Sequence, residues 1–223
     1  KCVKSFYYHP MMKGSNSIKQ VLPTVLKVSK FLEDKYSQPM KFGRNLNGRV
    51  LWQDTLTAGR RIDAISNLAG IRGRPIIDRG LVIAVSNGGV IAAIDLRTGH
   101  RIWSREIASI ESPWVAGDFV FVLSNESELV AISREHGKIQ WVRGLPRFED
   151  PENSEDPIIW TGPILASDRL IIAGSNEEAL AVSPYNGRIL GVVEMPDRVT
   201  VAPIIADGSV YFLADDAQLI AYK

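Results

Sequence analysis

Four copies of one pattern, a proline followed eighteen residues later by an alanine, run along residues 75–221. The step between copies varies, at 38, 50 and 40 residues, whereas the internal offset stays constant. A constant unit joined by loops of different length is typical of a repeated supersecondary structure. The pattern therefore excludes most folds built around a single site and predicts a repeat protein. The pairs are Pro75 with Ala93, Pro113 with Ala131, Pro163 with Ala181, and Pro203 with Ala221.

The first complete copy, residues 74–107, contains four short apolar runs separated by turns rich in glycine, asparagine and aspartate. Runs 81–85 and 90–95 are almost wholly aliphatic, which is typical of strands that are buried on both faces. The last run, 101–107, alternates apolar and polar residues, as a half-exposed strand does. Four short strands in a repeat of about 40 residues predict an all-β fold made of β-propeller blades.

A glycine recurs six residues after the alanine in three copies, and in two of them a tryptophan follows four residues later. The glycine can supply the positive φ that a tight turn between strands needs. Because a tryptophan ring buries a large area, we expect these rings to lie between neighbouring blades rather than to stack on a ligand. Gly191 replaces the tryptophan in the third copy. The repeat residues are Gly99, Gly137, Gly187, Trp103 and Trp141, with Gly48 and Trp52 at the same spacing before the first copy.

The copies do not add up to a whole number of blades. Residues 48–56 match only a turn and a fourth, outer strand, and residues 200–223 supply only three strands. Residues 48–56 could complete the last blade of a four-bladed ring, or the chain could be half of an eight-bladed ring. An open blade edge would also favour self-association. Within a repeat region of 46–223, we place the blades at about 71–107, 110–145, 158–195 and 200–223.

Residues 1–45 show no trace of the repeat. Between residues 18 and 36, apolar side chains recur at intervals of three and four, which predicts one amphipathic helix. Pro23 weakens its first turn, so the pattern is strongest over residues 24–36. We expect its apolar face to pack on the propeller or on a partner rather than on a membrane surface.

The composition excludes several functional classes. A net charge of +1 gives no general attraction to nucleic acid or anionic lipid. His100 and His136 lie beside turn glycines without a metal-ligand spacing, so we interpret them as solvated. The acidic stretch 149–156 lacks the order of an EF-hand and is interpreted as a solvated loop. We therefore expect no metal, no cofactor and no enzyme activity.

Residues 90–103 resemble the PQQ-type propeller repeat, in which an alanine, an aspartate, a Thr-Gly pair and a tryptophan follow in fixed order. The motif recurs in decayed form at 130–141 and 180–191. Two families share it, the PQQ-dependent dehydrogenases and the BamB family of outer-membrane assembly lipoproteins. The dehydrogenases need a full ring, a Ca²⁺ ion under the quinone and often a vicinal cysteine pair, whereas this chain has one cysteine, Cys2.

From about residue 48 to its end, the chain resembles the second half of BamB through residues 48–53, a polar loop with Ile62-Asp63, and residues 75–77. This resemblance implies half of an eight-bladed ring on the periplasmic side of the outer membrane. It also implies a non-catalytic scaffold that binds the periplasmic domains of the central barrel-assembly subunit. A lipid anchor is implied for the full-length protein, with Cys2 as either its attachment point or an ordinary thiol. A dehydrogenase-like enzyme and a fragment without independent function are the alternatives.

The resemblance further implies a partner-binding loop between Arg60 and Arg74. An exposed apolar pair beside an acid and arginines suits an interface hot spot. The two isoleucines of this loop could equally anchor it to the core. The candidate partner-binding residues are Ile62, Asp63, Ile65, Ser66, Arg72 and Arg74.

Overall fold

The computed structural model describes residues 50–56 and 72–223 of this chain. The chain divides into two compact units, Lys1–Leu51 and Trp52–Lys223, and the sheets all belong to the second. Every regular element in the described residues is a β-strand, so the all-β prediction is confirmed for them. None of their elements is a helix of the length and apolar character that crossing a membrane requires. The helix predicted at 18–36 and Cys2 lie outside the described residues.

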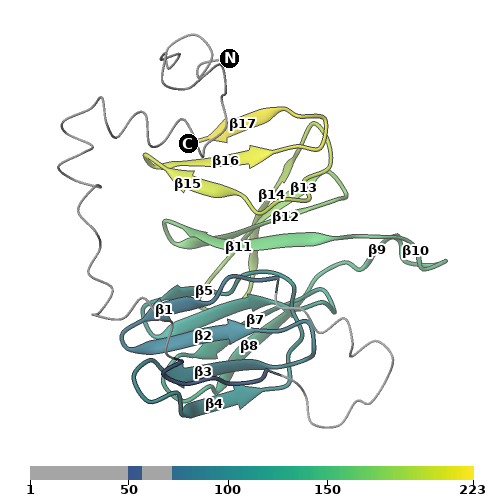
Figure 1. The fold of residues 1–223 in the computed structure, drawn as a ribbon. Coiled ribbons are helices and arrows are strands. Elements are labelled where there is room, and N and C mark those ends of the chain that lie inside the picture. Colours follow the sequence, from purple (N-terminus) through teal and green to yellow (C-terminus); the bar gives the residue numbers. More distant parts are fainter. Residues whose placement is uncertain (1–49, 57–71) are drawn as a thin grey trace, which may run out of the picture. The chain divides into compact units, whose positions relative to one another are not determined.

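The strands form antiparallel sheets in which each strand pairs with the next along the chain (Figure 1). We call the four main sheets blades 1 to 4. Blade 1 contains β1 (Ile76–Asp78), β2 (Leu81–Val85), β3 (Ile91–Asp95) and β4 (Arg101–Arg105). Blade 2 contains β5 (Trp114–Ala116), β6 (Phe119–Leu123), β7 (Glu128–Ser133) and β8 (Ile139–Gly144). Blade 3 contains β11 (Trp160–Ala166), β12 (Arg169–Gly174), β13 (Glu178–Val182) and β14 (Ile189–Glu194). Blade 4 contains β15 (Ile204–Ala206), β16 (Ser209–Leu213) and β17 (Leu219–Tyr222).

Two features differ from a simple series of blades. A two-stranded hairpin, β9 (Phe148–Asp150) with β10 (Glu155–Pro157), projects between blades 2 and 3. Residues 50–56 form no strand, although the sequence predicts an outer strand over 48–56. A strand exists only through a partner strand, and no sheet in the described residues includes this segment.

The core lies between the blades, because the central strands bury both of their faces. Ile83 and Ile91 of blade 1 pack against Val122 and Ile132 of blade 2, and all four side chains are fully buried. A second cluster joins blade 2 to blade 3 through side chains such as Phe121. Since successive residues of a strand point to opposite faces, each central strand contributes to both neighbouring interfaces. This double burial explains the nearly continuous aliphatic runs of the sequence.

A tryptophan from the outer strand of blade 1 and another from that of blade 2 also lock each of these blades onto the next. Trp103 of β4 lies against Gly137 in the β7–β8 turn, and its indole N–H donates to the Arg134 carbonyl oxygen at 2.6 Å. Trp141 makes the same contact in blade 3, with Gly187 and the Pro184 carbonyl oxygen at 2.9 Å. The turn glycines have positive φ and no Cβ, so the ring can approach the backbone closely.

Replacing Gly137 with alanine tests this lock. A Cβ at Gly137 would lie 2.5 Å from the Trp103 ring, and the backbone φ is +65°. Gly117 is the matched control, because its φ of +57° is similar but nothing lies within 4 Å of its Cβ position. We expect Gly117→Ala to lose about 1–2 kcal/mol of unfolding free energy, from strain alone. Gly137→Ala should lose about 3 kcal/mol or more in urea titrations, because ring displacement adds to the strain. Equal losses would contradict the lock.

Candidate partner-binding surface

Each blade has two different ends because its strands run as a meander. The turn from the first to the second strand and the turn from the third to the fourth lie at one end, the turn end. The turn from the second to the third strand and the connection to the next blade lie at the other, the loop end. Backbone bonds hold this end together, since Ser109 N–H donates to the Ser86 carbonyl oxygen and Asn125 N–H to that of Ala108. The tryptophan contacts lie at the turn end, and the variable connections gather at the loop end.

At the loop end, a series of hydrogen bonds joins the starts of three blades. The Arg74 N–H donates to the Ser112 hydroxyl oxygen at 2.8 Å, which links blade 1 to blade 2. The Glu111 carboxylate accepts from the Thr161 hydroxyl at 3.3 Å and from the Gly162 N–H at 3.4 Å, which links blade 2 to blade 3. These bonds fix where the connections enter the first strands.

Burial raises the pKa of the Glu111 carboxyl above its ordinary value. The Gly162 N–H, the Thr161 hydroxyl and the positive charge of Arg72 oppose this rise but do not cancel it. A desolvated carboxylate is costly unless its charge is fully compensated. Burial of the Glu111 carboxylate therefore costs some free energy, which the positive charge of Arg72 reduces. Nothing in the sequence indicated this role, because the residues it connects are far apart along the chain.

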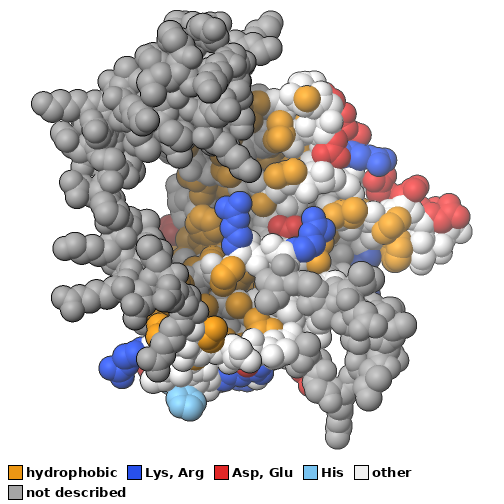
Figure 2. Space-filling model, viewed as in Figure 1, with side chains coloured by type: hydrophobic (Ala, Val, Ile, Leu, Met, Phe, Trp, Pro, Cys, Tyr) orange, Lys and Arg blue, Asp and Glu red, His pale blue; other side chains and the backbone are white. Residues whose placement is uncertain are grey.

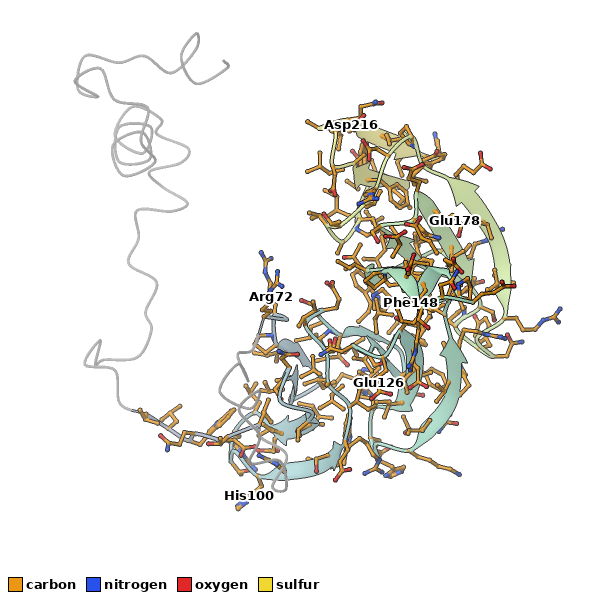
Figure 3. All side chains as sticks on the ribbon, turned by 90° about the vertical axis from the view of Figure 1, so that its right-hand side faces the viewer. Arg72, His100, Glu126, Phe148, Glu178 and Asp216 are labelled. Atoms are coloured by element: carbon orange, nitrogen blue, oxygen red, sulfur yellow. The ribbon has the colours of Figure 1, made fainter. Side chains whose placement is uncertain are left out.

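The candidate partner-binding residues divide into two groups. Arg72 and Arg74 are exposed at the loop end, directly before β1 (Figure 3 labels Arg72). Ile62, Asp63, Ile65 and Ser66 lie outside the described residues, as does Gly48. The structure therefore shows two exposed arginines at the point where the predicted loop rejoins blade 1.

The β9–β10 hairpin is the other exposed feature of the loop end. Figure 2 shows acidic side chains gathered on this projecting hairpin. Asp150 caps its turn by accepting from the Asn153 side-chain amide and from the N–H groups of Glu152 and Asn153, which lowers the pKa of Asp150. The sequence predicts a solvated loop over residues 149–156, and most of these residues are exposed. The two short strands of the hairpin were not part of that prediction. Among the described residues, no group of histidine, cysteine and acidic side chains could hold a metal ion.

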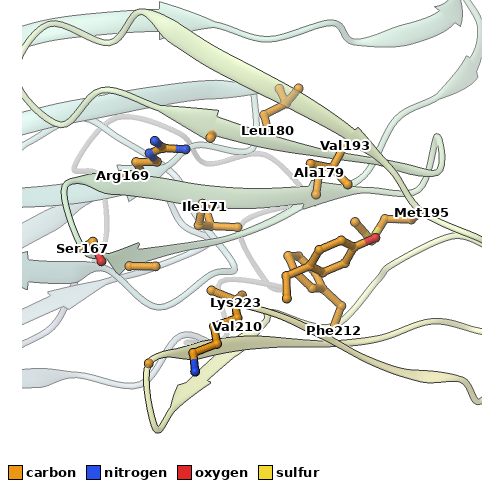
Figure 4. Close-up of a pocket in the computed structure, with 14 residues that line it drawn as sticks. Ser167, Arg169, Ile171, Ala179, Leu180, Val193, Met195, Val210, Phe212 and Lys223 are labelled. Atoms are coloured by element: carbon orange, nitrogen blue, oxygen red, sulfur yellow. The ribbon is translucent and has the colours of Figure 1, made fainter.

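A pocket of about 460 Å³ lies between blades 3 and 4 (Figure 4). It reflects smaller side chains at this interface. Blade 2 presents Leu129 and Trp141 to its neighbour, whereas the corresponding register positions of blade 3 carry Ala179 and Gly191. Phe212 of blade 4 fills part of the missing volume. We interpret the pocket as incomplete packing rather than as a ligand site.

Comparisons of the sequence and of the fold with known proteins give similar results. The model described as "Outer membrane protein assembly factor BamB" matches residues 42–143. BamB of Moranella endobia is 21% identical over 174 residues, which cover 78% of this chain and 42% of the relative. The crystal structure of BamB from Moraxella catarrhalis aligns with a TM-score of 0.67 at 17% identity, over 78% of this chain and 49% of that chain. The chain is similar to BamB in sequence and in fold.

The BamB-like chain spans less than half the length of these relatives. The crystal structure of a computationally designed protein named Ika4 is matched over almost its whole length. The alignment covers 98% of Ika4 and 77% of this chain, with a TM-score of 0.54 and 12% identity. Blades of this kind therefore also occur in a chain whose whole length is comparable to the repeat region.

The raised pKa of Glu111 gives a testable pH dependence. Because the folded-state pKa lies above the unfolded value, the native protein binds more protons in the window between the two. Stability should therefore fall as pH rises through this window, from just above pH 4 upward. Glu111→Gln keeps hydrogen-bonding atoms without the charge, so we expect a flatter stability profile and no loss of stability at pH 7. Urea titrations between pH 4 and 7 measure this, and an unchanged slope would contradict the assigned burial cost.

Proposed function

We propose that this BamB-like chain is a non-catalytic binding module of the outer-membrane β-barrel assembly machinery. The observation that carries the proposal is the match to BamB in sequence and fold over more than three quarters of the chain. The name of that relative describes an outer-membrane protein assembly factor. The proposed place of action is the periplasmic side of the outer membrane, where such factors would meet the central barrel subunit.

We propose the loop end as the binding surface. Its connections vary in length while the blades stay constant, and variable loops on a rigid scaffold are where binding residues concentrate. Arg72 and Arg74 are exposed there, and the Arg74 backbone is held by Ser112. Arginine is enriched at protein interfaces because its planar group binds carboxylates with two hydrogen bonds. The partner surface should accordingly present acidic side chains to these arginines, and the proposed loop residues Ile62 and Asp63 would extend the contact.

Charge reversal at the loop end tests the proposal. Arg72→Glu combined with Arg74→Glu should weaken binding to the purified periplasmic domains of a barrel-assembly subunit by about tenfold or more. Surface plasmon resonance at two salt concentrations measures the change, and the wild-type Kd should rise with salt because the contact is electrostatic.

Arg188→Glu is the matched control, because Arg188 is an exposed arginine in the β13–β14 turn at the turn end. It should leave the Kd within about twofold of wild type, as expected for a charge outside the interface. Asp63→Lys in the same assay tests the loop itself. If the wild-type chain binds and none of the loop-end variants weakens it, the proposed surface is wrong.

A further inference from the structure

Strand β14 is an exposed edge strand of blade 3. Among the described residues it pairs only with β13, so the N–H and C=O groups along its other edge have no strand partner. All six of its residues are exposed, and none of the first five carries a charge. An exposed, apolar edge of this kind is a template for pairing with another strand. Its large apolar side chains, each between 42% and 53% exposed, are Ile189, Leu190, Val192 and Val193.

The outer strands of blades 1 and 2 carry charged side chains, whereas the apolar part of β14 does not. Arg101 and Arg105 lie on β4, and Arg143 lies on β8. Charges on an edge strand discourage pairing with a second sheet, because pairing would desolvate them or bring like charges together. The bulge near the start of the strand is common to β4, β8 and β14, so it does not distinguish them. Of these three outer strands, β14 is therefore the least protected against pairing.

The sequence around β14 is complementary to itself when two copies run antiparallel. Arg188 lies directly before the strand and Glu194 is its last residue, so five uncharged residues separate two opposite charges. With Gly191 of one copy opposite Gly191 of the other, Arg188 of each copy lies opposite Glu194 of the second copy. The apolar residues that face each other in this register are Ile189 with Val193 and Leu190 with Val192.

The two charges select this register. Arg188 and Glu194 are both exposed, and the ion pairs among the described residues involve neither. A shift of the pairing by one residue places Glu194 opposite Ile189 in one direction or opposite Gly187 in the other, and both charge pairs are lost. Opposite charges that face each other across two strands stabilise the pairing, whereas like charges destabilise it. The pairing centred on Gly191 is therefore favoured over its neighbours.

We propose that two copies of this chain associate through their β14 strands, which pair antiparallel about a twofold axis at Gly191. A twofold interface uses the same surface on both copies, so each contact occurs twice. The pairing satisfies the backbone groups of both edges and covers their apolar side chains. It does not depend on the proposed barrel-assembly partner, because Arg72 and Arg74 precede β1 in blade 1 and lie outside the contact.

Cysteine cross-linking tests the register. In a chain carrying Cys2→Ser, Gly191→Cys places one thiol of each copy on the proposed axis. Among the described residues, nothing lies within 4 Å of the Cβ position of Gly191, so the substitution is accommodated in the single chain. Residues directly opposite in an antiparallel pair have Cα atoms about 4.5–5.5 Å apart, which is within disulfide reach. We expect mild oxidation to give a species of doubled mass on a non-reducing gel.

Gly144→Cys in the same background is the matched control. Gly144 is the last residue of the outer strand β8, and its Cβ position is equally open. This variant should stay monomeric under the same oxidation. Absence of the Gly191→Cys cross-link, or equal cross-linking of the control, would overturn the proposal.

A charge swap tests the facing pairs without cysteines. Glu194→Arg places an arginine opposite Arg188 at both ends of the contact, so the dimer Kd should rise by about tenfold. Arg188→Glu should weaken the dimer to a similar extent. The double variant, Arg188→Glu with Glu194→Arg, restores opposite charges and should return the Kd to within about twofold of wild type. Sedimentation equilibrium measures these values, and Lys138→Glu, at the same turn position in blade 2, should leave the Kd unchanged.

The outcomes separate this proposal from the loop-end proposal. A wild-type chain that is monomeric at every concentration would overturn the second copy as the partner of β14, even if the monomer binds a foreign strand there. A dimer that Glu194→Arg leaves intact, or a double variant no tighter than the single ones, would overturn the register. Arg188→Glu should keep its affinity for the barrel-assembly domains while losing self-association, so either proposal can fail without the other.

Discussion

The contact between a tryptophan ring and a turn glycine orders this molecule. The Trp103 and Trp141 rings cross from the outer strand of one blade to the third-to-fourth strand turn of the next, where the indole N–H donates to a carbonyl oxygen. Trp52, in residues 50–56, makes the same contact with the corresponding turn of blade 1. The contact needs a residue without a Cβ and with positive φ on one side, and a large flat ring on the other. Apolar clusters between the blades supply most of the burial, whereas this directional bond fixes how one blade is placed on the next. The loop end is consequently held on a rigid frame.

Where the contact is missing, the packing loosens. Gly191 occupies the tryptophan position of blade 3, and a pocket opens between blades 3 and 4. The outer strand β14 is exposed along its whole length. The interface between blades 3 and 4 is thus less tightly packed than the interfaces between blades 1, 2 and 3.

Much of the fold could be predicted from sequence because its signals are local. The aliphatic runs at 81–85 and 90–95 reflect burial of each strand on both faces, and the Gly–Trp spacing reflects a turn followed by a strand. The link from Glu111 to Thr161 and Gly162 could not be predicted, since it joins residues fifty positions apart with no periodic signal. The hairpin β9–β10 could not be predicted, because its residues are mostly polar and show no alternation of apolar and polar side chains. Residues 50–56 of the strand predicted at 48–56 form no strand, because a strand requires pairing with a second segment and no sheet of the described residues includes them.

We propose that this chain binds its partner through the loop end of a rigid array of blades. Hydrogen exchange of the chain with and without the periplasmic domains of a barrel-assembly subunit tests it most directly. We expect slower exchange at residues 72–75 and in the connections 106–113 and 145–159, with the tight turns at 96–100 and 134–138 unchanged. Protection confined to the turns of the opposite end, or no protection at a saturating partner concentration, would contradict it.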